Sequence, residues 1–99
     1  MDVEFECNGD SFVWNADKAQ KNWRKHGVRF EEAATVFADP LFVLVEASRD
    51  GEARDAVIGF DAIGRLLYVV HIEIEIESAH IRIISARRAE PKEESEYAV

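Results

Sequence analysis

Residues 66–86 hold two consecutive β-like segments with almost no chain between them, which commits this part of the molecule to an antiparallel pair. Over residues 72–77 isoleucine and glutamate alternate strictly, and only an extended strand turns this period of two into one apolar and one charged face. Two earlier runs rich in branched and aromatic residues are followed by turn-forming stretches. The pattern therefore predicts four strands in succession, at 41–47, 54–60, 66–77 and 79–86.

The last two of these strands have a predicted register. If residues 78–79 form a two-residue turn, Glu75 lies opposite Arg82 and isoleucine lies opposite isoleucine. An acid opposite a base stabilises a strand pair by about 0.2–1 kcal/mol. In this register Arg82 shares a face with His71, whereas Arg87 falls on the opposite face unless a bulge in the last strand turns it.

Helical periodicity is confined to the part of the chain before these strands. Asn15 is suited to cap a helix over 16–26, and Gly27 is suited to the left-handed residue that ends it. A second helix is predicted to begin at Phe30. It ends before Pro40, because the residue preceding a proline is driven out of the helical region.

The two ends of the chain carry shorter signals. Asn8 and Gly9 separate two short apolar runs, so residues 1–11 are expected to form an N-terminal extension built as a hairpin or strand. Pro91 suits the first position of a helix, and residues 88–99 are expected to form a short helix or tail. The sequence thus predicts one α+β domain over its 99 residues: a short N-terminal hairpin or strand, two helices, a four-stranded mostly antiparallel sheet and a short C-terminal helix.

Charge is distributed unevenly along the chain. Twelve Lys and Arg residues against twenty Asp and Glu residues give a net charge of −8, which argues against a protein that grips a polyanion with its whole surface. Residues 14–30 nevertheless hold five cations and one acid. Lys18, Lys21 and Lys25 lie within about 60° of one another around the predicted helix. This stripe is either a phosphate-binding surface or an ordinary solvated helix face.

Composition excludes several other classes of protein. Hydrophobic residues make up 47% of the chain, which suits a folded core. The longest apolar runs are about five residues, whereas a membrane-spanning helix needs about 20. The single cysteine, Cys7, can form neither an internal disulfide nor a zinc cluster. We therefore expect a cytoplasmic protein without membrane contact.

Several short motifs follow one another in a characteristic order. They begin with Phe-Val-Trp-Asn at 12–15, and continue with Lys-His-Gly-Val at 25–28 and Phe-Glu-Glu-Ala at 30–33. Later blocks are Gly-Arg-Leu-Leu at 64–67 and Ile-Arg-Ile-Ile-Ser-Ala-Arg at 81–87. In this order the motifs resemble the BrnT toxins, the ribonuclease half of a bacterial type II toxin–antitoxin pair, which are related in fold to RelE-like endoribonucleases. The resemblance covers nearly the whole chain.

The resemblance implies a function and a set of partners. It implies cleavage of RNA without a metal or another cofactor, inhibition of translation, and neutralisation by a small BrnA-like antitoxin. DNA would be contacted only through that antitoxin, and the family pattern admits a homodimer or a toxin–antitoxin heterotetramer. The net negative charge of the chain leaves a second hypothesis open. In this hypothesis the chain is a catalytically weak or inactive member of the family that binds an antitoxin or another protein.

RNA cleavage by the ribose 2′-hydroxyl needs a base, an acid and cations that stabilise the extra negative charge. The arginines that match the family motifs are Arg54, Arg82 and Arg87. Their planar guanidinium groups fit phosphate oxygens, and we expect them to be catalytic. His71 is the expected proton carrier, since the ordinary pKa of histidine is about 6.5. The alternatives are that Arg82 only pairs with Glu75, that Arg54 is a solvated turn residue, and that His71 is a structural residue.

Substrate binding is assigned to the first helix. Lys18, Lys21, Lys25 and His26 are expected to contact RNA phosphates and guide the strand toward the arginines. For His26, at the helix end, the alternative is a structural role in capping carbonyl groups.

Overall fold

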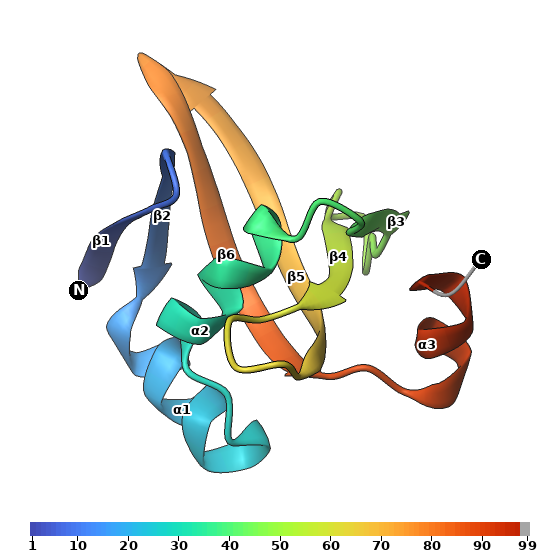
Figure 1. The fold of residues 1–99 in the computed structure, drawn as a ribbon. Helices are drawn as coiled ribbons and strands as arrows, with labels where there is room; N and C mark the ends of the chain where they lie inside the picture. The colour runs from blue at the N-terminus through green and yellow to red at the C-terminus, as the bar shows by residue number, and fades with distance from the viewer. Residues whose placement is uncertain (98–99) are drawn as a thin grey trace.

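The computed structural model describes residues 1–97, which form one six-stranded sheet in the order β1-β2-β6-β5-β4-β3 (Figure 1). Neighbouring strands are antiparallel, except that β2 and β6 are parallel. The strands are β1 Asp2–Cys7, β2 Asp10–Asn15, β3 Val43–Glu46, β4 Asp55–Phe60, β5 Leu66–Ile76 and β6 Ser78–Arg88.

The N-terminal hairpin belongs to this sheet. Asn8 and Gly9 both have positive φ, +50° and +86°, as the tight turn between β1 and β2 requires. β2 then pairs with β6, with Phe12 beside Ile81. The prediction of an α+β fold is right, but the predicted four-stranded sheet is wrong, because the sheet has six strands and is mixed. A parallel pairing between segments so far apart leaves no local pattern in the sequence.

Three α-helices and one 3₁₀ turn complete the described chain: α1 Ala16–His26, α2 Phe30–Ala34, η1 Thr35–Ala38 and α3 Pro91–Tyr97. The predicted bounds and caps of α1 are confirmed, since the Asn15 side chain accepts from the Lys18 N–H and Gly27 is left-handed. The predicted second helix tightens into η1 after one turn. The last two residues of the predicted 88–99 segment lie outside the described ones. No helix in residues 1–97 has the length and hydropathy of a membrane span.

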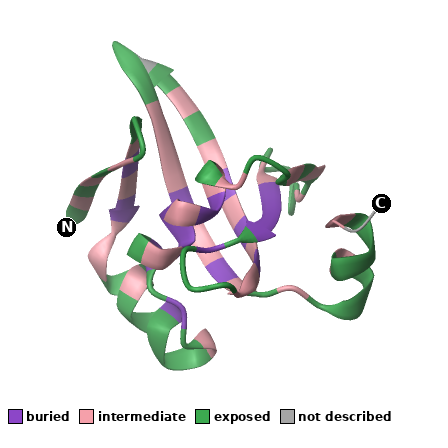
Figure 2. Ribbon diagram, in the orientation of Figure 1, coloured by how far each residue is buried: buried purple, intermediate pink, exposed green. Residues whose placement is uncertain are grey.

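The sheet has a core face and an outer face. We call core face the side against which α2 and η1 pack, and outer face the opposite side, where α3 lies. Phe12 and Trp14 of β2 meet Phe30 of α2 in the core, with Trp14 and Phe30 edge to face at 5.8 Å between ring centroids. The buried residues gather where α2 and η1 meet the middle of the sheet (Figure 2).

The β5–β6 hairpin turns at Glu77, not at residues 78–79. Glu77 has φ +68°, and Ile72 lies opposite Arg82 while His71 lies opposite Ile83. The predicted register is therefore wrong, and Arg82 and His71 lie on opposite faces of the sheet. Burial of apolar side chains determines this register. Burying Ile83 in the core stabilises the fold by about 1.5–3 kcal/mol, which is more than an exposed acid–base pair contributes.

A β-bulge lies in the middle of the same hairpin. Val70 pairs with Ser85 and the next residue, His71, pairs with Ile83, so that Ile84 is an extra residue in β6. The extra residue reverses the alternation of β6 beyond that point. The sequence predicted that Arg82 and Arg87 would share a face only if the last strand contained a bulge, and this bulge is present.

Candidate functional site

The bulge at Ile84 determines which side chains β6 presents on the outer face. Arg82 lies before the bulge, and Ser85 and Arg87 follow it, with Arg87 opposite Tyr68 of β5. Without the extra residue, strict alternation would send Arg82 and Arg87 to opposite faces. The bulge therefore places two of the three predicted catalytic arginines on the same face of the sheet.

A cavity of about 350 Å³ opens on the outer face between the loop that joins β3 to β4 and strands β5 and β6. This volume lies within the ~300–1,000 Å³ typical of small-molecule sites. Three arginines line it, together with three hydroxyl groups. The lining residues are Ala47, Ser48, Arg49, Arg54, Tyr68, Val70, Ser85 and Arg87. Arg54 and Arg87, predicted from separate motifs, thus meet in one cavity.

Arg87 is held from three sides. Its guanidinium lies over the Tyr68 ring, 4.4 Å from the ring centroid, and its two terminal nitrogens each donate to a Glu93 carboxylate oxygen at 2.8 Å. It also donates to the Arg88 carbonyl at 3.1 Å. The hydrogen bonds to Glu93 raise the pKa of Arg87. Burial raises the pKa of Tyr68, and the negative charge of Glu93 raises it further. Both groups therefore keep their protons at neutral pH.

Each of the predicted catalytic arginines is paired with a carboxylate. Arg54 contacts Glu52 at 2.6 Å and Arg82 contacts Asp2 at 2.9 Å. The side chains of Glu52 and Asp2 are 66% and 50% exposed, and such surface pairs contribute only about 0–1 kcal/mol. The Nε of Arg54 is buried and has no hydrogen-bond partner within the described part of the chain. The pairs at Arg54 and Arg82 therefore contribute little to the stability of the fold.

Helix α1 lies along the edge of β6 that β2 leaves free. The Asn22 amide nitrogen donates to the carbonyl oxygens of Ala86 at 2.8 Å and Val28 at 3.0 Å, and the Ala86 N–H donates back to the Asn22 side-chain oxygen at 3.0 Å. Asn22 thus makes the hydrogen bonds to Ala86, the residue before Arg87, that a neighbouring strand would otherwise make. It fixes the backbone from which Arg87 projects.

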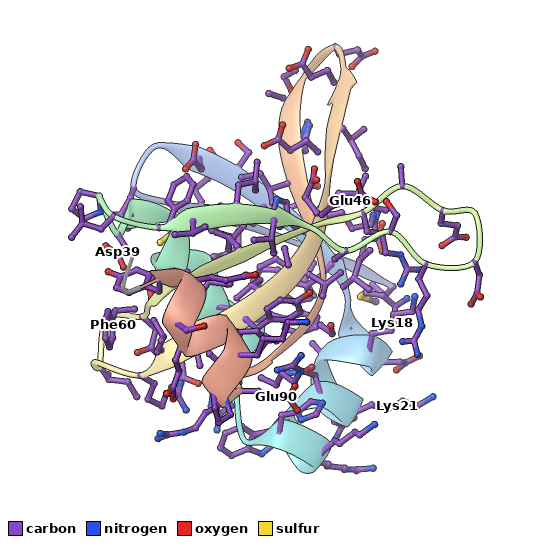
Figure 3. All side chains as sticks on the ribbon, turned by 90° about the vertical axis from the view of Figure 1, so that its right-hand side faces the viewer. Lys18, Lys21, Asp39, Glu46, Phe60 and Glu90 are labelled. Carbon is purple, nitrogen blue, oxygen red and sulfur yellow. The ribbon has the colours of Figure 1, made fainter. Side chains whose placement is uncertain are left out.

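The cationic residues of α1 flank this face. Lys18, Lys21 and Lys25 are exposed, and Figure 3 shows Lys18 and Lys21 projecting from the helix into solvent. Burial lowers the pKa of His26, and the positive charges of Lys25 and Arg87 lower it further. Neither His26 nor any of the three lysines lines the cavity.

His71 is not part of this site. It is 0% exposed on the core face, where its ring packs edge to face against Phe37 at 4.9 Å between centroids. Its Nδ1 lies 3.2 Å from the Val69 carbonyl oxygen. No substrate reaches a side chain in this place, so the expectation that His71 faces a phosphate together with Arg82 is wrong.

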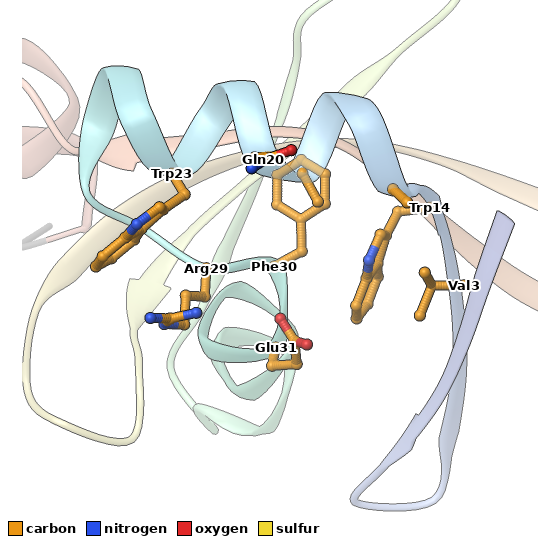
Figure 4. Close-up of a pocket in the computed structure, with 9 residues that line it drawn as sticks. Val3, Trp14, Gln20, Trp23, Arg29, Phe30 and Glu31 are labelled. Carbon is orange, nitrogen blue, oxygen red and sulfur yellow. The ribbon is translucent and has the colours of Figure 1, made fainter. Parts of the chain in front are cut away.

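A second hollow, of about 330 Å³, lies on the other side of the molecule between α1, α2 and β1 (Figure 4). Its walls are mostly aromatic and aliphatic, and the Arg29 guanidinium stacks on the exposed Trp23 ring, 4.3 Å from its centroid. It contains none of the predicted catalytic residues. We therefore place the candidate site on the outer face.

The sequence reasoning gave no role to several residues of the site. Ser85 shares the outer face with Arg82 only because of the bulge in β6, which no local pattern reveals, whereas Tyr68 lies there by the regular alternation of β5. Glu93 comes from α3, a separate element. Asn22 left a readable signal, since it is an uncharged polar residue at the edge of the apolar face of α1, between Ala19 and Trp23.

Comparison with protein families gives a match over most of the chain. The family described as "Ribonuclease toxin, BrnT, of type II toxin-antitoxin system" matches residues 14–93. The chain belongs to the BrnT family. A comparison with curated proteins gave no match. The BrnT match begins inside β2 and ends inside α3, so it includes Arg54, Arg82, Arg87 and Glu93. Type II systems pair a toxin with a protein antitoxin, so membership implies such a partner.

Proposed function

We propose that this chain is an endoribonuclease that cleaves RNA by attack of a ribose 2′-hydroxyl on the adjacent phosphodiester, without a metal ion. The observation that carries the proposal is the meeting of Arg54 and Arg87 in one cavity on the outer face. Two guanidinium groups beside one phosphate are suited to stabilising the extra negative charge of its transition state. That electrostatic contribution is usually the largest single one in such reactions.

The roles of the three arginines differ. Arg87, fixed by the Tyr68 ring and by the Asn22-held backbone, binds the scissile phosphate. Arg54, whose Nε is buried without a partner in the described chain, binds the same phosphate from the β4 side. Arg82 does not line the cavity and binds a neighbouring phosphate of the strand along β6.

The RNA strand extends from this cavity toward α1. Lys18, Lys21, Lys25 and His26 follow the free edge of β6 and supply the positive charge that a strand of phosphates requires. They form a local basic surface on a chain whose net charge is −8. The expected outcome in the cell is cleavage of cytoplasmic RNA and inhibition of translation, relieved by a BrnA-like antitoxin that carries the DNA contacts of the complex.

A second candidate function is binding of the antitoxin without catalysis. The observation that favours it is the carboxylate paired with each of Arg54, Arg82 and Arg87, together with the acidic balance of the chain. In this case expression would leave growth unaffected while the chain still captured its antitoxin.

One experiment separates the two functions. Purified protein is incubated with RNA in EDTA, and Arg87→Ala is compared with Arg88→Ala. Both variants remove one positive charge from the end of β6, but Arg88 lies opposite Leu67, away from the outer face. The proposal expects cleavage to 2′,3′-cyclic phosphate ends, slowed at least about tenfold by Arg87→Ala and less than twofold by Arg88→Ala. Absence of cleavage by the wild-type protein, with retained antitoxin binding, would favour the second function.

A further inference from the structure

Helix α3 covers part of the outer face, and its Glu93 side chain occupies the terminal nitrogens of Arg87. We propose that α3 is a displaceable cover of the RNA site, in which the Glu93 carboxylate occupies the place of the substrate phosphate on Arg87. RNA then binds only when α3 moves away. This inference rests on the proposed function and adds the regulation of the same site.

The contact between Glu93 and Arg87 has the geometry of a phosphate contact. Both carboxylate oxygens accept from the two terminal nitrogens of the guanidinium at 2.8 Å, the fork-to-fork arrangement that arginine also forms with phosphate. The Glu90 backbone N–H donates to the same carboxylate at 2.8 Å. The Glu93 side chain is only 15% exposed, so this pair is better shielded from water than those of Arg54 and Arg82. A phosphate cannot use the same donors while Glu93 does.

The cover is attached at few points. α3 contains no buried residue, and its far end is held by Tyr97, whose hydroxyl donates to Asp39 at 2.7 Å and whose ring packs edge to face on Phe60 at 5.3 Å. With seven residues, α3 is shorter than the ~12–15 at which an isolated helix becomes marginally stable. Once its contacts are lost, α3 therefore unfolds into a tail. The preceding Ala89 N–H remains bonded to the Leu66 carbonyl at 2.9 Å and marks where the moving segment begins.

The charge of α3 also opposes RNA. Residues 90–97 hold four glutamates and one lysine, and they lie beside the arginines that would bind phosphates. An RNA strand entering with α3 in place would meet both an occupied guanidinium and a negative surface. Displacement removes both obstacles in one step.

The test compares Glu93→Gln with Glu94→Gln. Both remove one negative charge from α3, but Glu94 is exposed and its side chain has no partner within residues 1–97. Inorganic phosphate is titrated while the side-chain Nε–H resonance of Arg87 is followed by NMR, and RNA cleavage is measured in parallel. We expect Glu93→Gln to raise phosphate affinity at Arg87 and the initial rate of RNA cleavage by about fivefold, and Glu94→Gln to change either by less than twofold.

A third variant weakens the cover without changing charge. Tyr97→Phe removes the hydroxyl that binds Asp39 and leaves Glu93 in place, and it should raise both quantities by about twofold. Equal phosphate affinity in Glu93→Gln and Glu94→Gln overturns the cover, whatever the RNA assay shows. Higher phosphate affinity in Glu93→Gln with no RNA cleavage by any variant supports the cover and rejects the ribonuclease function.

Discussion

The Asn22 side chain forms both hydrogen bonds that a neighbouring strand would offer to Ala86, one from its amide nitrogen at 2.8 Å and one to its oxygen at 3.0 Å. This links α1 to β6 at the residue immediately before Arg87. The helix that carries the lysines and the strand that carries the arginines are thereby fixed relative to each other. A substitution at Asn22 should disturb both the stability of the domain and the geometry of the site.

We predict that Asn22→Ala lowers the free energy of unfolding by about 2–3 kcal/mol, because it leaves the buried N–H and carbonyl of Ala86 without partners. Urea denaturation measures the difference. Gln20→Ala, an exposed site on the same helix, is the control and should change stability by less than about 0.5 kcal/mol. Equal effects of the two substitutions would show that the link to β6 contributes nothing.

We predict that His71→Leu leaves RNA cleavage within twofold of wild type. His71 is fully buried on the core face, and leucine fills a similar volume without a polar atom. Stability should change by less than about 1.5 kcal/mol. Single-turnover cleavage rates, measured with the protein in excess over RNA, check the first part. A cleavage rate at least a hundredfold lower in a folded variant would show that His71 takes part in the reaction.

Arg54→Ala and Arg82→Ala should affect different kinetic constants of RNA cleavage. Arg54 lines the cavity and Arg82 does not, so Arg54→Ala should lower kcat by about tenfold or more, whereas Arg82→Ala should raise KM with kcat within about twofold. Steady-state cleavage of one short RNA at several concentrations gives both constants. If both variants lower kcat alike, Arg82 contacts the scissile phosphate itself.

The docking of α3 should depend on pH. Burial alone would raise the pKa of Glu93, but hydrogen bonds from Arg87 and from the Glu90 N–H outweigh it and hold the pKa below the usual 4.5. A carboxyl whose pKa is lowered by folding stabilises the folded state fully above its unfolded value, and this contribution is lost as the pH falls through the folded pKa. We therefore predict that α3 stays docked at pH 6 and detaches as the pH falls below about 4.5.

Amide hydrogen exchange in residues 92–97, corrected for its intrinsic pH dependence, measures this detachment. Asp39 contributes in the same direction. Burial opposes the effect, but bonds from the N–H groups of Phe60 and Leu41 and from the Tyr97 hydroxyl lower its pKa. In Glu93→Gln the transition should be weaker, because only Asp39 then titrates. An unchanged transition in that variant would assign the pH dependence to Asp39 alone.

Local signals were sufficient to predict most elements of the fold. The cap at Asn15 and the left-handed Gly27 delimit α1 at the predicted residues, since both act within one turn of the helix. The positions of β3 to β6 followed from alternation and turn residues. What failed depended on contacts between distant segments. The parallel pairing of β2 with β6 and the turn at Glu77 are both determined by which side chains the core buries.

The same distinction applies to the candidate site. Motif resemblance named Arg54, Arg82 and Arg87, but only the bulge at Ile84 decides that the last two share a face. His71 was misplaced because the register was displaced along the strand, and an odd displacement moves every side chain to the other face. Glu93 had no signal of its own, since an acid on a short polar helix is commonplace.

The pairing of Phe12 with Ile81 sets a limit on when the sheet is completed during synthesis. The first hairpin is made early, but the strand that pairs with it within the described residues is β6, which is synthesised after all the other strands and also carries Arg82 and Arg87. Contacts of such large sequence separation form late in folding. A nascent chain translated only as far as β5 therefore lacks both arginines, and on the proposed function such a fragment would leave the RNA that encodes it uncleaved.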